Sequence, residues 1–387
     1  MSPAVIVDAV RTPIAKGKRG AYAELHPVDL HAHALAALVQ RTGIDPAVVD
    51  DVISGAVGQV GEQSTDTARW ALLGAGFPES VPGVTVDRQC GSSQQAVHFA
   101  AQGIMAGAYD VAIASGVESM SRTPIGSQTL GKDFVGSRAG GRYDGSLVPQ
   151  GISAELIAER WKLSRTELDE FAAESHRRAA KAWADGRFGS EGTFVNELHT
   201  DETIRPESSV ETLAGLRPAF KNDDWEQRYP HLDWKITAGN SSPVNDGSAA
   251  VLITTEEAAQ QLSLTPRARL HSFAVTGDDP IFMLTGIIPA TRKVLARAGL
   301  SLGDIDAFEV NEAFASVVLA WQKETGAPLE KVNINGGAIA IGHPLGASGA
   351  RLMTTLVNVL EQTEGRYGLQ VMCEAGGQAN ATIIERI

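Results

Sequence analysis

The sequence predicts an α/β protein in which helices cover a parallel or mixed sheet, with the same fold present twice in one chain. Short apolar runs that end at small-residue turns alternate with amphipathic runs of helical period, which is typical of this class. Segments from the two ends also align: residues 48–57 are similar to residues 302–313, and residues 108–120 to residues 366–378. With 387 residues and 43% hydrophobic content, the chain can support two or three domains.

The first 120 residues read as a strand, helix and strand, followed by a second unit of the same kind. Strands are expected at the short apolar runs, and helices where apolar residues recur every three to four positions. The expected order is a strand over 3–13, a helix over 26–43, a strand over 50–57, a strand over 84–87, a helix over 92–107 and a strand over 109–120.

The C-terminal part repeats this order of elements. A strand over 268–275 precedes a helix over 288–299 that has a proline in its first turn, which proline tolerates. The remaining elements are a strand over 305–314 that runs into a turn, a strand over 332–337, a helix over 346–362, and two strands joined by a turn over 369–387.

The middle of the chain breaks this rhythm. It holds a Gly-rich stretch, a strongly helical segment over 153–186 and a charged connection containing tryptophans, before a strand and helix over 247–262 complete the first half. An insertion of this length is more often a functional cover than a passive loop. We therefore divide the chain into an N-terminal half (1–120 and 244–264), an insertion (121–243) and a C-terminal half (265–387).

Composition excludes several functions. A net charge of −13 argues against nucleic acid as a partner, because phosphate binding depends on clustered Lys and Arg. No apolar run approaches the roughly 20 residues of a membrane span, and the first residues lack a secretion signal, so a cytoplasmic protein is expected. The nine histidines are scattered without metal-ligand spacing, and no Walker or dinucleotide-binding loop occurs in the right setting.

The chain has only two cysteines, Cys90 and Cys373, and each lies in a small-residue turn after an apolar run. A thiol at the mouth of a helix is acidified by unpaired N–H groups and the helix dipole. The pair therefore suggests a nucleophile and an acid/base. Two alternatives stay open: inert buried thiols, which are common, and a disulfide, for which the context is weak.

Two further residues could complete such chemistry. His343 lies between a predicted strand and helix at the sheet end expected to hold Cys90, and it could activate the thiol as a base or be a capping or core histidine. Asn311 could cap the following helix or position a water that donates to an oxyanion. We assign no chemical role to Glu312.

Five segments together resemble the ordered motif set of the thiolase family, the acyl-CoA C-acyltransferases. They are DRQCGSSQQA (87–96), ITAGNSSPVNDGSAA (236–250), VNEAFA (310–315), NGGAIAIGHPLGASGAR (335–351) and MCEAGGQAN (372–380). The resemblance covers essentially the whole chain. It implies the thiolase fold, with duplicated βαβαβαββ halves in an αβαβα layered arrangement and an inserted helical loop domain that covers coenzyme A.

The resemblance also implies catalytic roles. Cys90 would take up the acyl group, and His343 would activate it and help bind the thioester oxygen. Asn311 would hold a water in the first oxyanion hole, and Cys373 would shuttle the proton at the α carbon. The backbone N–H groups of Cys90 and Ala375 would form the second oxyanion hole, although Ala375 stands where the family usually has glycine, which keeps the donor but restricts the backbone.

Binding residues follow from the same resemblance. Ser242 and Arg217 match positions that contact coenzyme A, which is a substrate rather than a permanently bound cofactor. Met283 and Phe314 match pocket-lining positions, with ordinary core packing as the alternative. Gln150, after Pro149, replaces the His-Met pair typical of short-chain biosynthetic members, which is similar to members that accept bulkier acyl chains.

The implied activity is thiolytic cleavage of a 3-ketoacyl-CoA by CoA, with ping-pong kinetics through an acylated Cys90. The wording of the motifs is similar to actinobacterial members of fatty-acid or steroid degradation, and a homodimer or homotetramer is implied. Alternatives are a biosynthetic acetoacetyl-CoA thiolase and a non-catalytic acyl-CoA or lipid-binding relative. Ketoacyl synthases are disfavoured because they lack a thiol equivalent to Cys373.

Overall fold

The N-terminal half is built on a mixed sheet in the computed structural model, which describes residues 3–387. Its strand order is β4 (Gly83–Val86), β3 (Asp51–Gly55), β5 (Val111–Ser119), β6 (Asn245–Thr255) and β1 (Ala4–Arg11). The first three strands are parallel and the pairs with β6 are antiparallel. A short β2 (Ala15–Lys16) also pairs with β6.

The C-terminal half repeats this arrangement. Its order is β8 (Ala307–Val310), β9 (Tyr367–Glu374), β10 (Gln378–Arg386) and β7 (Ala268–Gly277), again parallel first and antiparallel afterwards. Val332 bridges Phe308 in parallel and so takes the place that β4 has in the first half. The matching order confirms the predicted duplication, and pairing of β1 with β7 makes the two sheets continuous.

The strand predicted over 332–337 is wrong, because only Val332 makes a bridge. The side chain of the next residue, Asn333, replaces the backbone ladder: its amide accepts from Val310 N (2.9 Å) and donates to Val310 O (2.9 Å). The chain then turns through Gly336, whose φ of 83° favours glycine.

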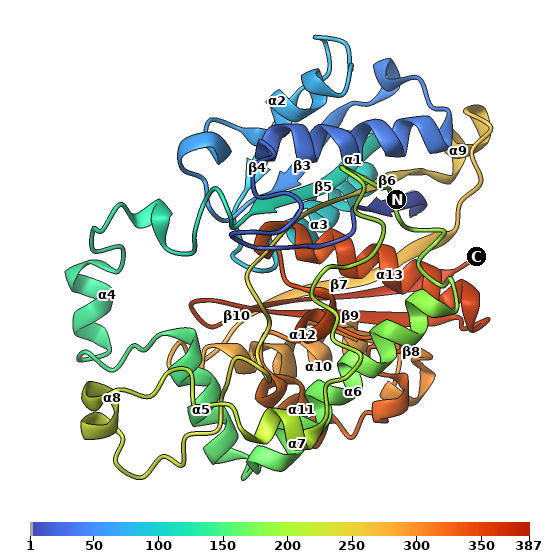
Figure 1. Ribbon diagram of the computed structural model, residues 1–387. Coiled ribbons are helices and arrows are strands. Elements are labelled where there is room, and N and C mark those ends of the chain that lie inside the picture. Colours follow the sequence, from blue (N-terminus) through green and yellow to red (C-terminus); the bar gives the residue numbers. More distant parts are fainter. Residues whose placement is uncertain (1–2) are drawn as a thin grey trace.

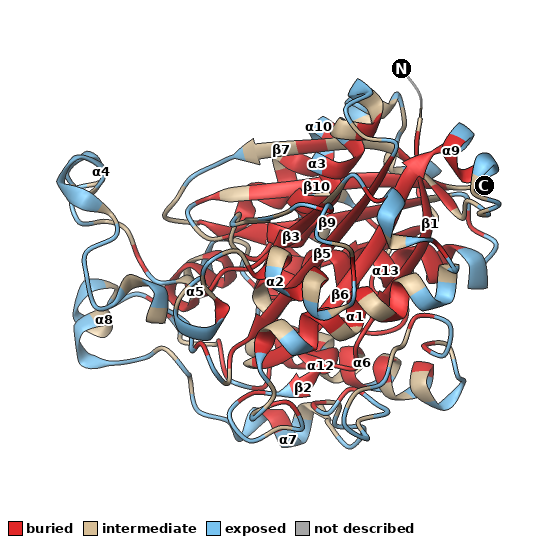
Figure 2. Cartoon of the chain, turned by 90° about the horizontal axis from the view of Figure 1, so that it is seen from above, coloured by how far each residue is buried: buried red, intermediate tan, exposed pale blue. Residues whose placement is uncertain are grey.

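Helices and sheets form five layers, as Figure 1 shows. The pair α1 (Pro27–Thr42) and α2 (Thr67–Gly74) covers the N-terminal sheet, and α10 (Ile287–Ala298) and α11 (Ala315–Thr325) lie beyond the C-terminal sheet. Between the sheets lie α3 (Ser92–Ala106) and α13 (Ser348–Gln362). Residues 348–360 are all buried, so α13 is covered on every side (Figure 2). The αβαβα prediction is confirmed.

The insertion contains α4 (Gly136–Arg142), α5 (Gln150–Arg160), α6 (Arg165–Ala184), α7 (Val210–Ala214) and α8 (Asp223–Arg228). The predicted single helical segment over 153–186 is two helices, because Lys162 takes a φ of 52° and Ser164 starts α6 with a capping box to Glu167. The N-terminal half closes with α9 (Glu256–Gln261), and α12 (Ala338–Ile341) packs on α6.

In Figure 1, α4 and α8 extend away from the layered body. The domain boundaries proposed from the sequence stay predictions. Within residues 3–387, no helix combines the length and hydropathy that crossing a membrane requires.

Candidate active site

A tight turn presents Cys90 at the start of α3. Gln89 has a φ of 49°, and its N–H donates to Asp87 Oδ1 (2.6 Å), while Gly91 N donates to Arg88 O (3.1 Å). Positive φ at a non-glycine residue is uncommon and often marks a functional turn. The turn places Cys90 directly before Gly91, the N-cap of α3, where it is 3% exposed.

Cys373 lies in strand β9, paired with Ala379 of β10, and not at the mouth of a helix. The sequence-based expectation for its surroundings is therefore wrong. Cys90, its predicted neighbour, is close enough to Cys373 for the two thiols to interact electrostatically. Burial raises the pKa of Cys90 well above its usual value, and the charges of Cys373 and then Glu374 raise it further.

The predicted acidification of the thiols is also wrong for the resting site. Burial raises the pKa of Cys373 to about 12, with a further contribution from Glu374. Two buried thiols beside an acidic side chain remain protonated, since burial and a neighbouring negative charge both penalise the thiolate. A base is needed to activate Cys90.

His343 is held by contacts from three elements. It follows Gly342, whose φ of 117° only glycine adopts readily, and its N–H donates to Asn245 Oδ1 on β6 (2.9 Å). Its Nδ1 lies 2.6 Å from Ser348 Oγ, and its Nε2 lies 3.4 Å from Asn311 Nδ2. Burial and then the charge of Arg351 lower the pKa of His343 to about 3, so the ring is neutral.

Asn311 does not cap a helix, because α11 begins at Ala315 with Phe314 as its N-cap. Instead it is buried at the end of β8, where its side chain lies close enough to Cys373 to oppose the rise in the pKa of that thiol. Its Oδ1 has no hydrogen-bond partner among residues 3–387. Asn311 thus connects the His343 ring to the second thiol.

Four distant segments meet at this point of the middle layer. Leu345, Leu352 and Met372 pack around Cys90, which places the region after His343 and the strand of Cys373 beside the nucleophile turn. The structure therefore brings Cys90, His343, Asn311 and Cys373 into one buried cluster. The arrangement supplies a thiol nucleophile, a neutral base, an amide and a second thiol for proton transfer.

The turn after Cys373 tolerates alanine. Left-handed backbone occurs at Gly376 (φ 82°) and Gly377 (φ 78°), whereas Ala375 is not among the positive-φ residues. A side chain at 377 would also meet Asp278 O at 2.7 Å. Alanine at position 375 therefore keeps the backbone N–H donor and, since its φ is not positive, does not strain the turn as the replacement of glycine had suggested.

Ala375, Met283 and Gln150 line a mainly apolar cavity of about 810 Å³. Met283 projects into it from an unusual turn with φ 50° and ψ −54°, in which Leu284 N donates to Phe282 O. Such turns are rare and strained, and strain of this kind concentrates at ligand sites. The sequence offered no signal for this turn.

The other predicted binding residues lie outside that cavity. Phe314 packs edge-on against Phe220 (5.9 Å between centroids), which fits its core alternative. Ser242 N donates to Ala313 O (3.0 Å), and Arg217 is exposed, without a side-chain hydrogen bond or ion pair within residues 3–387.

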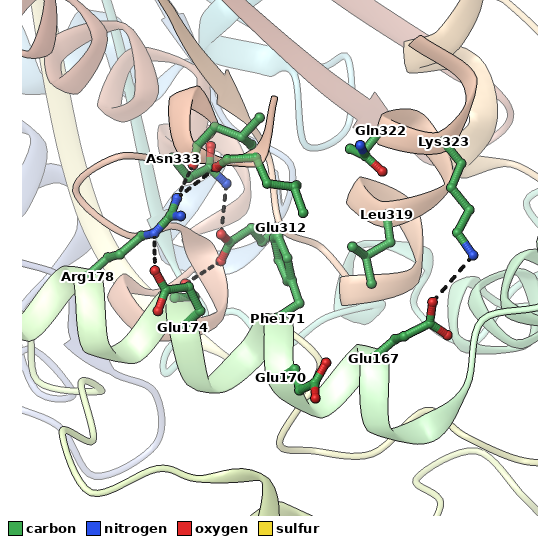
Figure 3. Close-up of a pocket in the computed structure, with 13 residues that line it drawn as sticks. Glu167, Glu170, Phe171, Glu174, Arg178, Glu312, Leu319, Gln322, Lys323 and Asn333 are labelled. Atoms are coloured by element: carbon green, nitrogen blue, oxygen red, sulfur yellow. Dashed lines mark hydrogen bonds and ion pairs between the residues drawn. The ribbon is translucent and has the colours of Figure 1, made fainter. Parts of the chain in front are cut away.

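Glu312 has a structural role. It accepts hydrogen bonds from Ser175 Oγ (2.7 Å), Asn333 Nδ2 (2.8 Å) and Ile339 N (3.0 Å), which ties α6 and α12 to the segment of Asn311. Figure 3 shows it at a separate cavity of about 340 Å³ between α6 and α11. Like the contacts of Asn245 and Ser348 with His343, these bonds join distant segments, so no spacing in the sequence could identify them.

Comparisons with known proteins concern the chain as a whole. The family models described as thiolase N-terminal domain and thiolase C-terminal domain match residues 4–257 and 264–386. The chain is 49% identical to a steroid 3-ketoacyl-CoA thiolase, FadA6, of Mycobacterium tuberculosis, over 100% of this chain and 95% of that protein.

Further relatives cover the chain equally well. A 3-ketoacyl-CoA thiolase of Erwinia tasmaniensis is 44% identical over 100% of both chains. The crystal structure of the Bacillus anthracis acetyl-CoA acetyltransferase superposes with a TM-score of 0.88 at 37% identity, covering 100% of this chain and 99% of that one.

Proposed function

The chain belongs to the thiolase family and is an acyltransferase with 3-ketoacyl-CoA thiolase activity, and from this premise we propose how its site residues divide the reaction. His343 accepts the Cys90 proton at Nε2, and the Cys90 sulfur attacks the keto carbon of the substrate. The backbone N–H groups of Cys90 and Ala375 stabilise the resulting oxyanion.

The carbon–carbon bond then breaks. The electron pair leaves as the enolate of acetyl-CoA, whose oxygen faces His343 and the water held by Asn311, and Cys373 donates its proton to the α carbon. Free CoA next gives its thiol proton to the Cys373 sulfur, attacks the acyl group on Cys90 and releases the shortened acyl-CoA. The proton held by His343 returns to Cys90.

The position of Asn311 is the observation that carries this assignment. Its amide lies 3.4 Å from His343 Nε2, and its side chain is near enough to Cys373 to affect the pKa of that thiol. It therefore lies between the group that activates the nucleophile and the group that protonates the leaving carbon. Because all of these side chains are buried, charge that develops there is weakly screened and oriented dipoles act strongly.

The acyl group is bulky in this proposal, and the physiological direction is degradative. Support comes from the volume of about 810 Å³ next to Ala375, whose lining includes the apolar Ile125, Phe134 and Val148. Gln150 at the same cavity replaces the residue typical of short-chain members. The name of the mycobacterial relative, a steroid 3-ketoacyl-CoA thiolase, points the same way.

A substrate panel tests this choice. CoA-dependent cleavage of 3-ketoacyl-CoAs, from acetoacetyl to long-chain and ring-bearing compounds, is followed as loss of enolate absorbance. Higher kcat/KM for the bulky members is expected. A preference for acetoacetyl-CoA would instead make the chain a biosynthetic-type thiolase, as the name of the Bacillus relative suggests for that protein. Absence of cleavage would favour the non-catalytic binding alternative.

We expect coenzyme A to bind where the insertion covers the site, in contact with Ser242 and Arg217. The side chain of Arg217 is exposed, and its guanidinium can pair with a phosphate group of coenzyme A. Replacement of Arg217 by Ala should raise the KM for CoA and for the 3-ketoacyl-CoA, which carries the same moiety, and leave the rate of Cys90 acylation at saturating substrate unchanged. An unchanged KM would remove Arg217 from this role.

A homodimer or homotetramer completes the proposal, together with a cytoplasmic location. Strand β4 is the last strand of its sheet, and Val84 on it is 41% exposed; the two helices that contact β4 also expose large apolar side chains, Trp70 (54%) on α2 and Phe99 (40%) on α3. An unpaired, apolar sheet edge favours association with a second copy. Light scattering on the full chain would give a monomer mass if this is wrong.

A further inference from the structure

Ser348, the first residue of α13, makes two hydrogen bonds. Together they determine which ring nitrogen of His343 carries a hydrogen. Its Oγ lies 2.8 Å from Pro344 O and 2.6 Å from His343 Nδ1, and the residue is fully buried. A carbonyl oxygen only accepts, so the contact with Pro344 requires the hydroxyl hydrogen of Ser348. The same oxygen can then only accept from the ring.

The contact at the other ring nitrogen of His343, Nε2, indicates the same tautomer. Asn311 Nδ2 is a donor and faces His343 Nε2 at 3.4 Å. A hydrogen on Nε2 would oppose the amide hydrogens, whereas a lone pair accepts from them. With Nδ1 protonated and Nε2 unprotonated, both ring nitrogens, Ser348 Oγ and Asn311 Nδ2 have hydrogen-bond partners.

We propose that Ser348 is a positioning residue that holds His343 in the Nδ1–H tautomer, so that Nε2 keeps the lone pair that can take the Cys90 proton. This inference rests on the proposed role of His343 as the base. When Nε2 accepts the Cys90 proton, both ring nitrogens carry hydrogens, and Ser348 Oγ still accepts from Nδ1. The serine therefore serves the ring before and after proton transfer, without moving.

The charges around the ring make this support necessary. The charge of Arg351 on α13 disfavours the imidazolium of His343, while Cys90, Cys373, Glu374 and Glu118 are titratable groups on the thiol side of the site. Since no carboxylate is bonded to Nδ1, the hydroxyl of Ser348 is the acceptor that steadies the cation among residues 3–387. Loss of this acceptor should slow deprotonation of Cys90 more than it weakens substrate binding.

Thr354, on the same helix, offers a matched control. Its Oγ1 donates to the carbonyl four residues earlier, Ala350 O (2.8 Å), as Ser348 Oγ does to Pro344 O, and it is also fully buried. Among the hydrogen bonds of residues 3–387, none joins Thr354 to His343. Thr354→Val removes the same kind of helix bond, and Ser348→Ala removes that bond and the ring acceptor.

The first experiment needs no substitution. Nitrogen-15 NMR of the full enzyme with labelled histidine, with the His343 signals identified by their absence in His343→Ala, reports which ring nitrogen carries hydrogen. A protonated Nδ1 and an unprotonated Nε2 are expected. A resting His343 with hydrogen on Nε2 alone would overturn the proposal.

The second experiment measures the acylation rate of Cys90 against pH. Ser348→Ala should slow acylation by about 100-fold with little change in KM and should alter the pH profile, whereas Thr354→Val should keep both. Equal losses in the two variants, or a Ser348→Ala enzyme as fast as the parent, would refute the role of Ser348. Normal acylation by His343→Ala would instead refute the proposed function of His343.

Discussion

Burial sets the protonation states of the reacting residues. Both thiols have raised pKa values, and the pKa of His343 is lowered to about 3, so the cluster is neutral before substrate arrives. A neutral thiol beside a neutral imidazole costs little to bury, whereas a thiolate–imidazolium pair would need compensating contacts. Reaction then depends on proton transfer timed with bond formation rather than on a standing thiolate.

The nucleophile can be tested by replacing one atom. We expect Cys90→Ser to abolish acyl transfer, because a hydroxyl in this buried setting is a far weaker nucleophile than the sulfur. Binding of CoA should persist, since Cys90 is placed at the reacting end of the substrate. Mass spectrometry of the enzyme after mixing with acyl-CoA and calorimetric titration with CoA make the two measurements; turnover by the variant would show that another group carries the acyl chain.

The second thiol has a separate readout. Cys373→Ala should block exchange of the α protons of acetyl-CoA with deuterated solvent, because this group moves that proton in the proposed reaction. Transfer of an acyl group onto Cys90 should continue. Proton NMR follows the exchange, and exchange at the parental rate would exclude Cys373 as the acid/base.

Glu374 predicts a pH dependence of stability. Burial raises its pKa from 4.5 to about 9, and its side chain packs on Gly91 with Oε2 unpartnered among residues 3–387. Between those values the folded protein holds the proton that the unfolded chain has lost, so stability falls as pH rises through this window. Each unit of pKa difference corresponds to about 1.4 kcal/mol.

Glu374→Gln resembles the protonated acid and cannot ionise. Its free energy of unfolding, relative to that of the parent, should therefore increase from about pH 5 to about pH 9. Urea unfolding at several pH values measures this difference. A difference that does not change with pH would mean that Glu374 is ionised in the folded protein.

At the scale of elements, the turns decide where the reacting groups point. The β9–β10 hairpin turns through Gly376 and Gly377, both with left-handed backbone, and Ala375 at its start lines the same cavity as Met283. The Cys90 turn uses Gln89 in the same way before α3. Each turn ends a strand and aims a polar group at the shared site.

Two glycine substitutions separate backbone strain from close packing in the hairpin. Gly376→Ala adds strain of roughly 1–2 kcal/mol, because its φ is positive but nothing obstructs a side chain closely. Gly377→Ala adds similar strain and also drives a methyl group into Asp278 and Pro280. Denaturant unfolding should show the larger loss for Gly377→Ala; equal losses would mean that the neighbouring loop adjusts.

For the molecule as a whole, a buried ion network joins the insertion to the layered body. Arg11 on β1 donates to Glu191 Oε1 (2.5 Å) and, through two nitrogens, to Asp201 (2.7 and 3.0 Å), and all three side chains are at most 1% exposed. Both carboxylates come from the segment after α6. The network therefore holds the insertion in register with the sheet.

Arg11→Ala should destabilise the fold by about 3–5 kcal/mol, because two buried carboxylates lose their cation. The exposed pair of Arg177 with Glu174 provides the control, and Arg177→Ala should change the unfolding midpoint much less. Urea unfolding compares the variants. Similar midpoints for both would show that water reaches the Arg11 site.

The spacing of apolar residues was sufficient to predict the strands and helices that local interactions determine. The strands and helices of both halves follow from apolar periodicity, and the duplication from aligned segments, as the matching strand orders confirm. Pattern failed at 332–337, where the Asn333 side chain replaces a ladder, and at Asn311, whose helix starts later. In each case a contact between distant residues overrides local preference.

The sequence by itself determined the class of fold, the family and the identity of the residues in the cluster, because these depend on residue types at fixed positions along the chain. Only the tertiary structure decided that the thiols are protonated, that His343 is neutral, and that Asn245 and Ser348 hold it. The physical reason is that pKa values and hydrogen-bond partners depend on burial and on neighbours brought together from distant segments, which no local stretch of sequence encodes.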